Sequence, residues 1–584
     1  MKRILLLIIA LAVAAFAGWY YWKFSQQIST APVAALLPRE TIFVAHMPDF
    51  KRARNEWEHC DVYQLYREPA VQDFLRKPLS SIPSSNAASQ TLREIEQLAP
   101  QNAFIALTSI DNNNPKLVGG FRFRGGKEEA GRIIGRWRSA LAGQNSKVKR
   151  ESVHYQRHEI EVAKTTAFSI ATVYDPPWFF AATDVAELQA LLDRADRRGA
   201  GPWDTLDRDD RYRATIPHRL SNYVTFVYFQ PKPFSQRLAA LRAAVGSAPA
   251  AGEVTMIEKL RCIAGSIRFE KGKLHDMLFL GMPKLEQGTA LTRSSVSFGT
   301  KDTFLYLAML LNLGEKADTL NQAAAFAGTK IFQALTDTGI TAADWQAAFG
   351  IEVGSLADWP SNAHWPSILV TLPVMDTAKA GKIVDALLRA DQQATWTQTE
   401  KDGVRYFSKQ SVAAFLAITP TIALSDRTLI AGLNPVSVEE AIKRSRSGSS
   451  ELADSQTYKA GTRLLPGPTN FFAYIDAAQL YSRLDASLRP MLLMAAAFLP
   501  AVGSSIDPGK LPAAEVITKH LSPIVSSQRY ADDGYLAESI GPITLDQLGI
   551  GVAILSSFGA SARQTGWSTP AISMPPASNP SPTP

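Results

Sequence analysis

Two stretches of this sequence, about 250 residues apart, follow the same pattern, and this similarity constrains the fold more than any other feature. In the first stretch, the strand-like run Val118 to Phe123 precedes a segment whose apolar residues recur at helical spacing. In the second, Ile368 to Leu372 precedes an equivalent segment. Residues 250 positions apart match in the two helical segments: Ala130, Ile133, Ile134 and Trp137 with Ala380, Ile383, Val384 and Leu387.

The similarity continues beyond these helices. Each stretch has an alternating strand, Val153 to Tyr155 or Val404 to Tyr406, and then a hairpin, SIATVYDPPWFFAATD or TIALSDRTLIAGLN. Each hairpin leads into a helix that begins at a good capping residue, Asp184 or Asn434. Further matched residues are Leu188, Leu191, Leu192 and Arg194 with Val438, Ala441, Ile442 and Arg444 and, after a four-residue deletion, Tyr212 with Tyr458 and Leu238 with Leu484. Chance likeness of two segments that alternate strands and helices is the alternative, but the collinear order and matched caps favour an internal repeat.

The fold class follows from the order of the elements in each stretch. Hairpins are mixed with helices, whereas a doubly wound parallel sheet needs steady alternation of one strand with one helix. We therefore predict an α+β protein made of two related units, each a mainly antiparallel sheet with helices packed on one face, behind an N-terminal transmembrane helix.

The run Ile4 to Trp22 contains no charged residue and follows Lys2 and Arg3. As a helix it is roughly 28 Å long, which is close to the hydrocarbon thickness of a bilayer. A signal peptide cleaved after Ala17 is the alternative. We favour the uncleaved anchor because it places the aromatic residues 19–22 at the headgroup level. The positive charges before the run predict a cytoplasmic amino terminus and an extracytoplasmic location for the rest of the chain.

The length of the chain and its polar segments predict six regions. They are a signal-anchor helix at residues 1–24, a tether at 25–36, a first α+β domain at 37–285, a helical connector at 286–360, a second α+β domain at 361–545 that repeats about 118–246, and a C-terminal helix with a disordered proline-rich tail at 546–584.

Shorter signals predict individual elements. Thr41 to Ala45 has the composition of a buried strand, and Thr303 to about Ala347 reads as helical. Hairpins are predicted over residues 260–282, turning at Lys271-Gly272, and over 524–540, turning at the Asp-Gly of residues 533–534. The apolar run Pro490 to Leu499 is too short to span a bilayer, so we expect a core helix.

The composition excludes several classes of protein. A net charge of +7 and a pI near 9.1 are spread over 584 residues, which is too low a charge density for a nucleic-acid-binding protein. Two cysteines, Cys60 and Cys262, are too few for a disulfide-rich scaffold or a multi-cysteine metal site. They could pair in an oxidising compartment, but free cysteine is usually buried, so we expect two separate buried thiols.

Two spacings could carry chemistry, and both have simpler interpretations. His154, His158 and Glu159 resemble a metal-binding set, but in a strand the two imidazoles lie about 13 Å apart, so exposed strand residues are the better interpretation. Ser146 and Lys149 have the serine–lysine spacing of penicillin-binding enzymes, but they lie in a polar loop without the accompanying motifs. We therefore predict no catalytic residue, cofactor site or metal site.

Cations are frequent between Lys116 and Arg157, where few acidic residues intervene. They could contact anionic lipid or an acidic wall polymer. We favour a solvated basic face because they are spread along several elements. The cations are Arg122, Arg124, Lys127, Arg132, Arg136, Arg138, Lys147, Lys149 and Arg150.

Four short segments stand out: the opening Leu37 to Thr41, the step Pro48-Asp49, and the sequences LPAAEVITKHLSPIV and DDGYLAESIGPIT near the carboxyl end. Together they resemble a group of bacterial envelope proteins defined only as a domain of unknown function. The resemblance would cover most of the chain outside the anchor and the tail. It implies this architecture and an envelope location, with the anchor in the inner membrane and the rest of the chain in the periplasm, and it implies no activity.

Three functions follow as hypotheses. The first is a non-catalytic binding or structural role in the cell envelope, with an envelope protein or an anionic wall or lipid component as partner. The second is an envelope hydrolase whose active-site residues are dispersed in the sequence. The third is a carrier that holds an apolar ligand between sheet and helices, using Trp178, Phe179 and Phe180.

Overall fold

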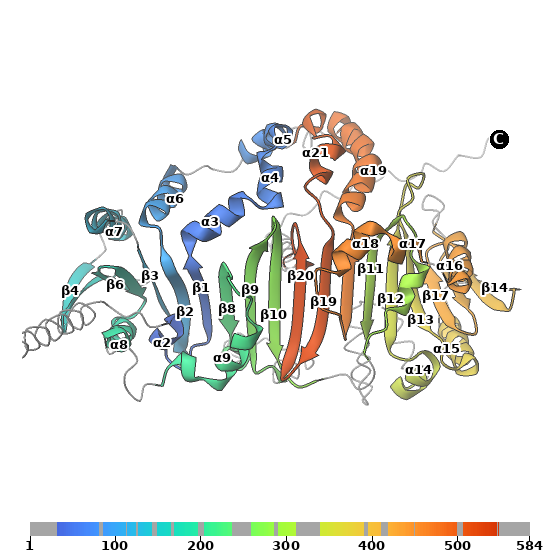
Figure 1. Cartoon of the computed structure of the whole chain (residues 1–584), viewed down its shortest axis with the longest axis horizontal. Coiled ribbons are helices and arrows are strands. Elements are labelled where there is room, and N and C mark those ends of the chain that lie inside the picture. The colour runs from blue at the N-terminus through green and yellow to red at the C-terminus, as the bar shows by residue number, and fades with distance from the viewer. Residues whose placement is uncertain are drawn as a thin grey trace, which may run out of the picture.

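A computed structural model gives the fold of the chain. It describes residues 32–545 and 547 except 81–85, 112–113, 124–125, 143–148, 165–168, 197–203, 236–258, 285–289, 311–338, 391–394, 410–417, 449 and 499–505. The described part is an α+β protein built on a single antiparallel sheet of 20 strands. The strands lie side by side along the long axis of the molecule (Figure 1).

The two halves of the sheet have the same strand order. From its outer edge to the middle, the first half runs β4, β5, β6, β7, β3, β2, β1, β8, β9, β10. The second half runs β14, β15, β16, β17, β13, β12, β11, β18, β19, β20. Strand β10 pairs with β20 and joins the halves into one sheet. The chain therefore folds as two equivalent ten-stranded arrangements with a shared central seam.

Most strands are short and alternate in burial, as expected for sheets covered by side chains. The strands of the first half are β1 (Phe43–Asp49), β2 (Gln101–Asp111), β3 (Asn114–Arg122), β4 (Lys149–Tyr155), β5 (His158–Lys164), β6 (Ser169–Asp175), β7 (Trp178–Ala182), β8 (Thr225–Phe229), β9 (Cys262–Glu270) and β10 (Lys273–Gly281). Those of the second half are β11 (Thr303–Leu310), β12 (Glu352–Asp358), β13 (Ser367–Pro373), β14 (Trp396–Lys401), β15 (Val404–Lys409), β16 (Thr421–Leu424), β17 (Thr428–Gly432), β18 (Phe471–Ile475), β19 (Ile524–Ala531) and β20 (Gly534–Gly541).

The seam has the geometry of a two-fold axis. Each central strand begins after a hairpin turn whose first residue, Lys271 or Asp532, has a positive φ. Met277 is the fifth residue of β10 and Glu538 is the fifth residue of β20, and these two residues face each other in the register. Equivalent residues that meet in this way mark the symmetry centre of an isologous contact. The predicted hairpins at 260–282 and 524–540 are confirmed, and they form this centre.

Helices lie on both faces of the sheet, so the prediction of helices on one face is wrong. In the first half, α8 (Val185–Asp196) packs in a core that contains Phe180, whereas α7 (Lys127–Ala142) packs in a core that includes Phe179. Adjacent strand residues point to opposite faces. In the second half, α16 (Pro435–Ser447) lies on one face, and α14 (Ala342–Phe349) and α15 (Thr377–Ala390) lie on the other.

A second group of helices lies beyond one end of the strands, at the top of Figure 1. The first half contributes α3 (Phe50–Glu58), α4 (Asp61–Arg67), α5 (Pro69–Ser80) and α6 (Asn86–Leu98), and the second contributes α19 (Ala477–Phe498), η4 (Pro508–Lys510) and α21 (Ala514–Thr518). Ion pairs join the two sets: Glu68 with Lys519 at 2.8 Å, and Asp73 with Lys510 at 3.1 Å. These contacts add a second connection between the halves.

The remaining short helices close the cores near the ends of the strands. They are α2 (Val33–Leu36), η1 (Leu206–Arg208), α9 (Asp210–Thr215) and η2 (Ile216–His218) in the first half, and η3 (Ser294–Phe298), α17 (Glu451–Asp454) and α18 (Gln456–Thr462) in the second. An aromatic cluster recurs beneath α9 and α18. Tyr212 meets the ring of Tyr228 at a centroid distance of 5.2 Å, and Tyr458 meets Tyr474 at 5.0 Å.

The structure corrects three further predictions. Val33–Leu36, assigned to the tether, is a buried helix. Thr303–Leu310, assigned to the helical connector, is strand β11, because its short apolar run fits either period and only strand pairing decides between them. Val153 to Tyr155 lies in β4, whereas Val404 to Tyr406 lies in β15, the counterpart of β5. Both strands of such a hairpin alternate, so local sequence could not distinguish them.

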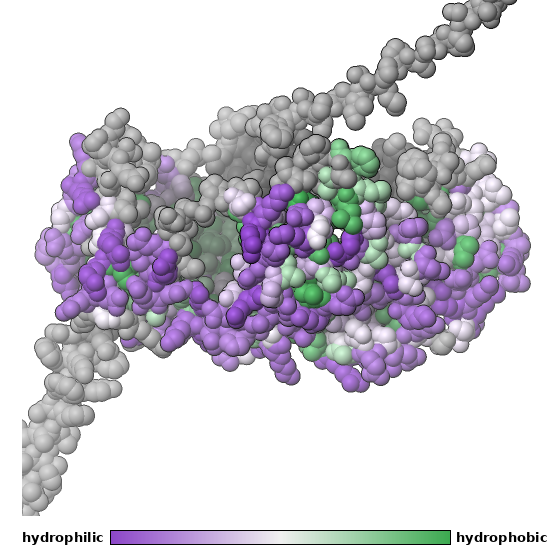
Figure 2. Space-filling view, turned by 90° about the horizontal axis from the view of Figure 1, so that it is seen from above, coloured by the Kyte–Doolittle hydropathy of each residue, from purple (hydrophilic) through white to green (hydrophobic). Residues whose placement is uncertain are grey.

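We predicted that the apolar end of α19 is a core helix, and this prediction is wrong. Met491, Met494 and Phe498 are 49%, 58% and 81% exposed among the described residues. Apolar side chains gather near the middle of the upper edge when the molecule is seen from above (Figure 2).

Within the part of the chain that the structure describes, no helix is long and apolar enough to cross a membrane. Residues 1–31, which include the predicted anchor, lie outside the described residues, as does nearly all of the predicted C-terminal region at 546–584. The anchor and the tail therefore stay predictions.

Candidate functional site

A pocket of about 470 Å³ lies in the second half of the molecule, between the sheet and α16. Strands β12 and β13 form its floor, η3 and the last turn of α16 form its walls, and the turn between β16 and β17 borders it. Most of its lining is polar. Seven hydroxyl side chains contribute: Ser294, Ser295, Ser297, Thr371, Ser425, Thr428 and Ser445.

Aromatic side chains fill the equivalent space in the first half. Phe180 stacks on Trp178 at a centroid distance of 5.1 Å and lies 6.4 Å from the ring of Phe104. Trp178 is 2% exposed and Phe180 is fully buried. These three residues occupy the space between the sheet and α8.

The pairing of the strands shows which residues replace this cluster. Phe104 of β2 and Gly354 of β12 are equivalent residues, because each pairs with the same position of the next strand, β3 or β13. Trp178 and Thr428 are also equivalent, because they are the first residues of β7 and β17. Ile430 takes the place of Phe180 by the same register. Three large rings are thus replaced by glycine, threonine and isoleucine, and the second half has room for a pocket.

Gly354 is required at its position. A Cβ atom there would lie 2.2 Å from the Cβ of Ser295 and 2.6 Å from the Oγ1 of Thr371. Glycine therefore lets η3 approach the sheet, and the Ser295 hydroxyl is held by the Tyr306 hydroxyl at 3.0 Å.

The one buried acid of the pocket, Glu352, serves the fold. Its carboxylate accepts hydrogen bonds from the Thr292 amide at 2.7 Å, the Thr292 hydroxyl at 2.8 Å and the Ser294 amide at 3.2 Å. It thereby anchors the beginning of η3 to the start of β12. A carboxylate with three donors is poorly suited to act as a general base.

Several hydroxyl groups of the pocket donate to the backbone and keep their oxygen lone pairs. Ser297 donates to the Ser294 carbonyl at 2.8 Å, and Ser445 donates to the Ile442 carbonyl at 2.7 Å. The oxygen of a hydroxyl that already donates can still accept from a ligand. The lining residues include no histidine, cysteine or lysine, and the two carboxylates are Glu352, which already accepts three hydrogen bonds, and Asp426, whose side chain is 80% exposed. The arrangement is suited to hydrogen bonding rather than to proton transfer.

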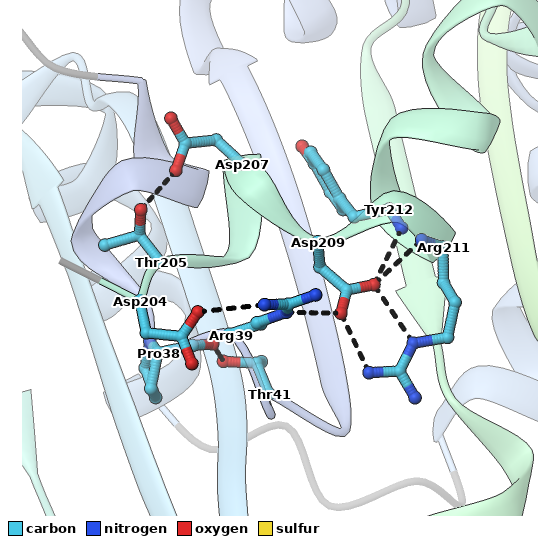
Figure 3. A network of polar contacts seen from close by, with 9 residues as sticks. All are labelled: Pro38, Arg39, Thr41, Asp204, Thr205, Asp207, Asp209, Arg211 and Tyr212. Carbon is cyan, nitrogen blue, oxygen red and sulfur yellow. Dashed lines mark hydrogen bonds and ion pairs between the residues drawn. The ribbon is translucent and has the colours of Figure 1, made fainter. Parts of the chain in front are cut away.

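Acidic residues gather in a second polar network, which links the start of the described chain to α9 (Figure 3). Arg39 makes ion pairs with Asp204 and Asp209, both at 3.3 Å. Asp209 caps α9 and accepts from the Arg211 guanidinium at 2.8 Å. Burial alone would raise the pKa of Asp209, but its hydrogen bonds with Arg211 hold the pKa below the ordinary value.

This network is structural, because arginine and threonine side chains occupy its carboxylates. Thr205 donates to Asp207 at 2.5 Å, and the Tyr212 amide donates to Asp209 at 3.3 Å (Figure 3). Among the described residues, no group of three or more His, Cys, Asp or Glu residues could hold a metal ion.

His158 differs from the sequence prediction. His154 and Glu159 are exposed as expected, but His158 is buried, with its Nδ1 3.1 Å from Asp175 and its Nε2 2.9 Å from Asp196. Hydrogen bonds to these two carboxylates raise the pKa of His158 to about 9. Sequence spacing could not predict this contact, because Asp175 and Asp196 belong to β6 and α8.

The structure also places the other candidate residues. Ser146 lies outside the described residues, and Lys149 is exposed at the start of β4. Cys60 and Cys262 are buried free thiols, so the prediction of two separate thiols is confirmed. Burial raises the pKa of Cys262 to about 11.

The aromatic residues proposed for an apolar carrier do not line a common cavity. Trp178 and Phe180 belong to the core under α8, whereas Phe179 points to the opposite face. There it borders a shallow apolar hollow of about 360 Å³ over β1, β2, β3 and β7, in which Ile105 is 50% exposed.

Sequence reasoning missed the pocket, although a signal for it was present. The two hairpin sequences align Trp178 and Phe180 with Thr428 and Ile430, 250 positions later. A loss of two large aromatic residues in one copy of a repeat predicts unfilled space there. The change from Phe104 to Gly354 lay outside the aligned stretches.

Comparison with known proteins identifies no family. No family model matches the chain, and no curated protein matches it. The structures of three crystal forms of TP0453 show a low similarity to this chain. Form I is 8% identical over 44% of this chain and 82% of that chain, with a TM-score of 0.24, and forms III and IV have the same TM-score at 7% identity, covering 44% and 42% of this chain and 83% and 79% of theirs. The function therefore has to be inferred from the residues of the chain itself.

Proposed function

We propose that this chain is a single-pass protein of the cell envelope, anchored in the inner membrane, whose periplasmic part binds its target without catalysis. The observation that carries the binding role is the chemistry of the pocket under α16. Its hydroxyl groups can accept hydrogen bonds, and its buried acid, Glu352, is already held by three donors. A site of this kind favours recognition over acid–base or nucleophilic chemistry.

The anchor and the location are inferred from the amino-terminal sequence. Residues 4–22 are apolar, and positive charges precede them. This pattern supports a signal anchor whose amino terminus lies on the cytoplasmic side of the membrane. The membrane is thus the first partner of the chain.

An envelope protein or an anionic wall or lipid component is the second partner that we propose. Arg132 of α7 and Lys149 and Arg150 of β4 are exposed. Arg136 is exposed as well but makes an ion pair with Glu94 at 3.1 Å. Exposed cations near one end of the sheet can attract anionic groups on a wall polymer or lipid. We propose no nucleic-acid partner, because the charge density of the chain is low.

A duplication origin is also proposed for the two halves. A tertiary contact recurs in both: the Nε of Arg194 donates to the Leu36 carbonyl at 2.7 Å, and the Nε of Arg444 donates to the Phe298 carbonyl at 3.0 Å. The two arginines are 250 positions apart, and each fixes its helix to the short helix that precedes the first strand of its half.

The location is tested by alkaline carbonate extraction of membranes together with protease digestion of spheroplasts. We expect the full chain to remain in the membrane pellet and to be degraded by external protease. A variant that lacks residues 1–31 serves as control and should appear in the soluble fraction. Release of the full chain by carbonate, or its complete protection in spheroplasts, would contradict the proposal.

A further inference from the structure

We propose that the pocket under α16 binds a small polyhydroxylated anion, namely a monosaccharide that carries a phosphate or carboxylate group. This inference rests on the binding role proposed above and specifies the class of ligand. Three features of the pocket carry it: its size, the hydroxyl groups inside it, and two arginines at its mouth.

The size and the lining suit a monosaccharide. The pocket volume of about 470 Å³ falls within the range of roughly 300–1,000 Å³ that is usual for small-molecule sites. Ser297 and Ser445 point their protons to backbone carbonyls, so their oxygens are left to accept from ligand hydroxyl groups. Phe298 and Ile442 form an apolar border against which the apolar face of a sugar ring can rest.

The charges at the mouth favour an anion. Arg427 lies in the turn between β16 and β17, and Arg446 lies in the last turn of α16. The Arg427 side chain is 90% exposed, 3.8 Å from Asp426, and Arg446 uses one nitrogen to donate to the Asp402 carbonyl at 2.9 Å. A guanidinium group can bind phosphate or carboxylate through two parallel hydrogen bonds.

The acids of the pocket do not cancel this preference. Glu352 is held by three donors at the base of η3, and the Asp426 side chain is 80% exposed. An anionic ligand at the mouth would therefore meet two arginines from different elements and one solvated aspartate.

Comparison of the two halves indicates a substitution that should fill the pocket. Trp178 fills the first half at the position that Thr428 occupies in the second. Thr428→Trp should therefore close the pocket with a side chain that the same fold already accommodates. Thr397→Trp, at an exposed position of β14, is the matched control because it adds the same ring away from the pocket.

Binding is measured by isothermal titration calorimetry on the full chain in detergent, with glucose 6-phosphate, glucuronate, glucose and inorganic phosphate as probes. We expect glucose 6-phosphate or glucuronate to bind at least about tenfold more tightly than both glucose and inorganic phosphate. Glucose lacks the charge that the arginines recognise, and inorganic phosphate lacks the hydroxyl groups that the serines recognise. Thr428→Trp should abolish this binding, and Thr397→Trp should preserve it.

The arginines are tested separately. Arg427→Gln and Arg446→Gln should each weaken the binding of the charged sugar about tenfold, whereas Arg463→Gln, at the exposed end of α18, should not. Unchanged circular dichroism and thermal unfolding would show that the variants are folded. The inference is overturned if no probe binds, if binding survives Thr428→Trp in the folded protein, or if glucose binds as tightly as the charged sugars. These outcomes leave the membrane location untouched, because fractionation tests it independently.

Discussion

At the scale of single residues, His158 is buried between two carboxylates and does not lie on a solvated strand face. Its pKa of about 9 lies above the ordinary value of about 6.5, so the folded state binds the proton more tightly than the unfolded state. The contact with Asp175 and Asp196 therefore stabilises the fold fully below pH 6.5. This stabilisation is lost as the pH rises through about 9.

We predict that His158→Gln lowers the free energy of unfolding by about 2 kcal/mol at pH 6 and by much less at pH 10. Urea unfolding at each pH gives the free energy of unfolding of the variant and of the unaltered protein. The difference between the two proteins removes the effect of other groups that titrate near pH 10. His154→Gln, at an exposed position of the neighbouring strand, is the control and should have little effect. An equal loss at both pH values would show that His158 contributes packing and not charge.

At the scale of elements, the seam between β10 and β20 is held by a chain of polar side-chain contacts as well as by backbone pairing. Arg268 contacts Glu270 at 2.6 Å, His275 contacts Glu270 at 3.1 Å, and Arg529 contacts Glu538 at 2.7 Å. His275 lies 3.5 Å from Glu538 and connects the two parts. The chain thus crosses four strands, two from each half.

Glu538→Gln tests this chain. Burial alone would raise the pKa of Glu538, but hydrogen bonds with His275 and Arg529 lower it, so its contribution is present above the ordinary carboxyl pKa and is lost as the pH falls below it. We expect a loss of about 2–4 kcal/mol at pH 7, because Arg529 and His275 lose a buried partner. The loss should shrink towards pH 3 in urea titrations. Glu400→Gln, at an exposed strand position, is the control and should change the free energy of unfolding little. An equal loss for both variants would show that the side-chain contacts across the seam do not stabilise the protein.

At the scale of the whole molecule, the continuous sheet predicts that the two halves unfold together. Both cysteines lie in the first half and are buried, so thiol labelling reports on that half alone. Circular dichroism reports on both. If the halves form one cooperative unit, labelling of Cys60 and Cys262 and loss of the β-sheet signal should have the same urea midpoint.

An exposed thiol gives the control for this experiment. A Thr397→Cys variant should react at once in the folded protein, which shows that the reagent is active. Labelling of the native cysteines well below the midpoint of the dichroism signal would mean that the first half opens independently.

The sequence by itself determined the local features of this protein. Apolar spacing identified α7 and α15, capping residues identified the starts of α8 and α16, and turn residues identified the central hairpins. These signals are readable because each depends on residues close together in the chain.

The tertiary structure alone decided how these elements combine. The strand nature of Thr303–Leu310, the use of both sheet faces and the single 20-stranded sheet all depend on pairing between distant segments. His158 is enclosed by carboxylates 17 and 38 positions away. The pocket exists because Gly354 of β12 and Thr428 of β17, 74 positions apart, line the same space. Periodicity predicts which side of an element is buried, but only the register of distant strands determines which side chains share that buried space.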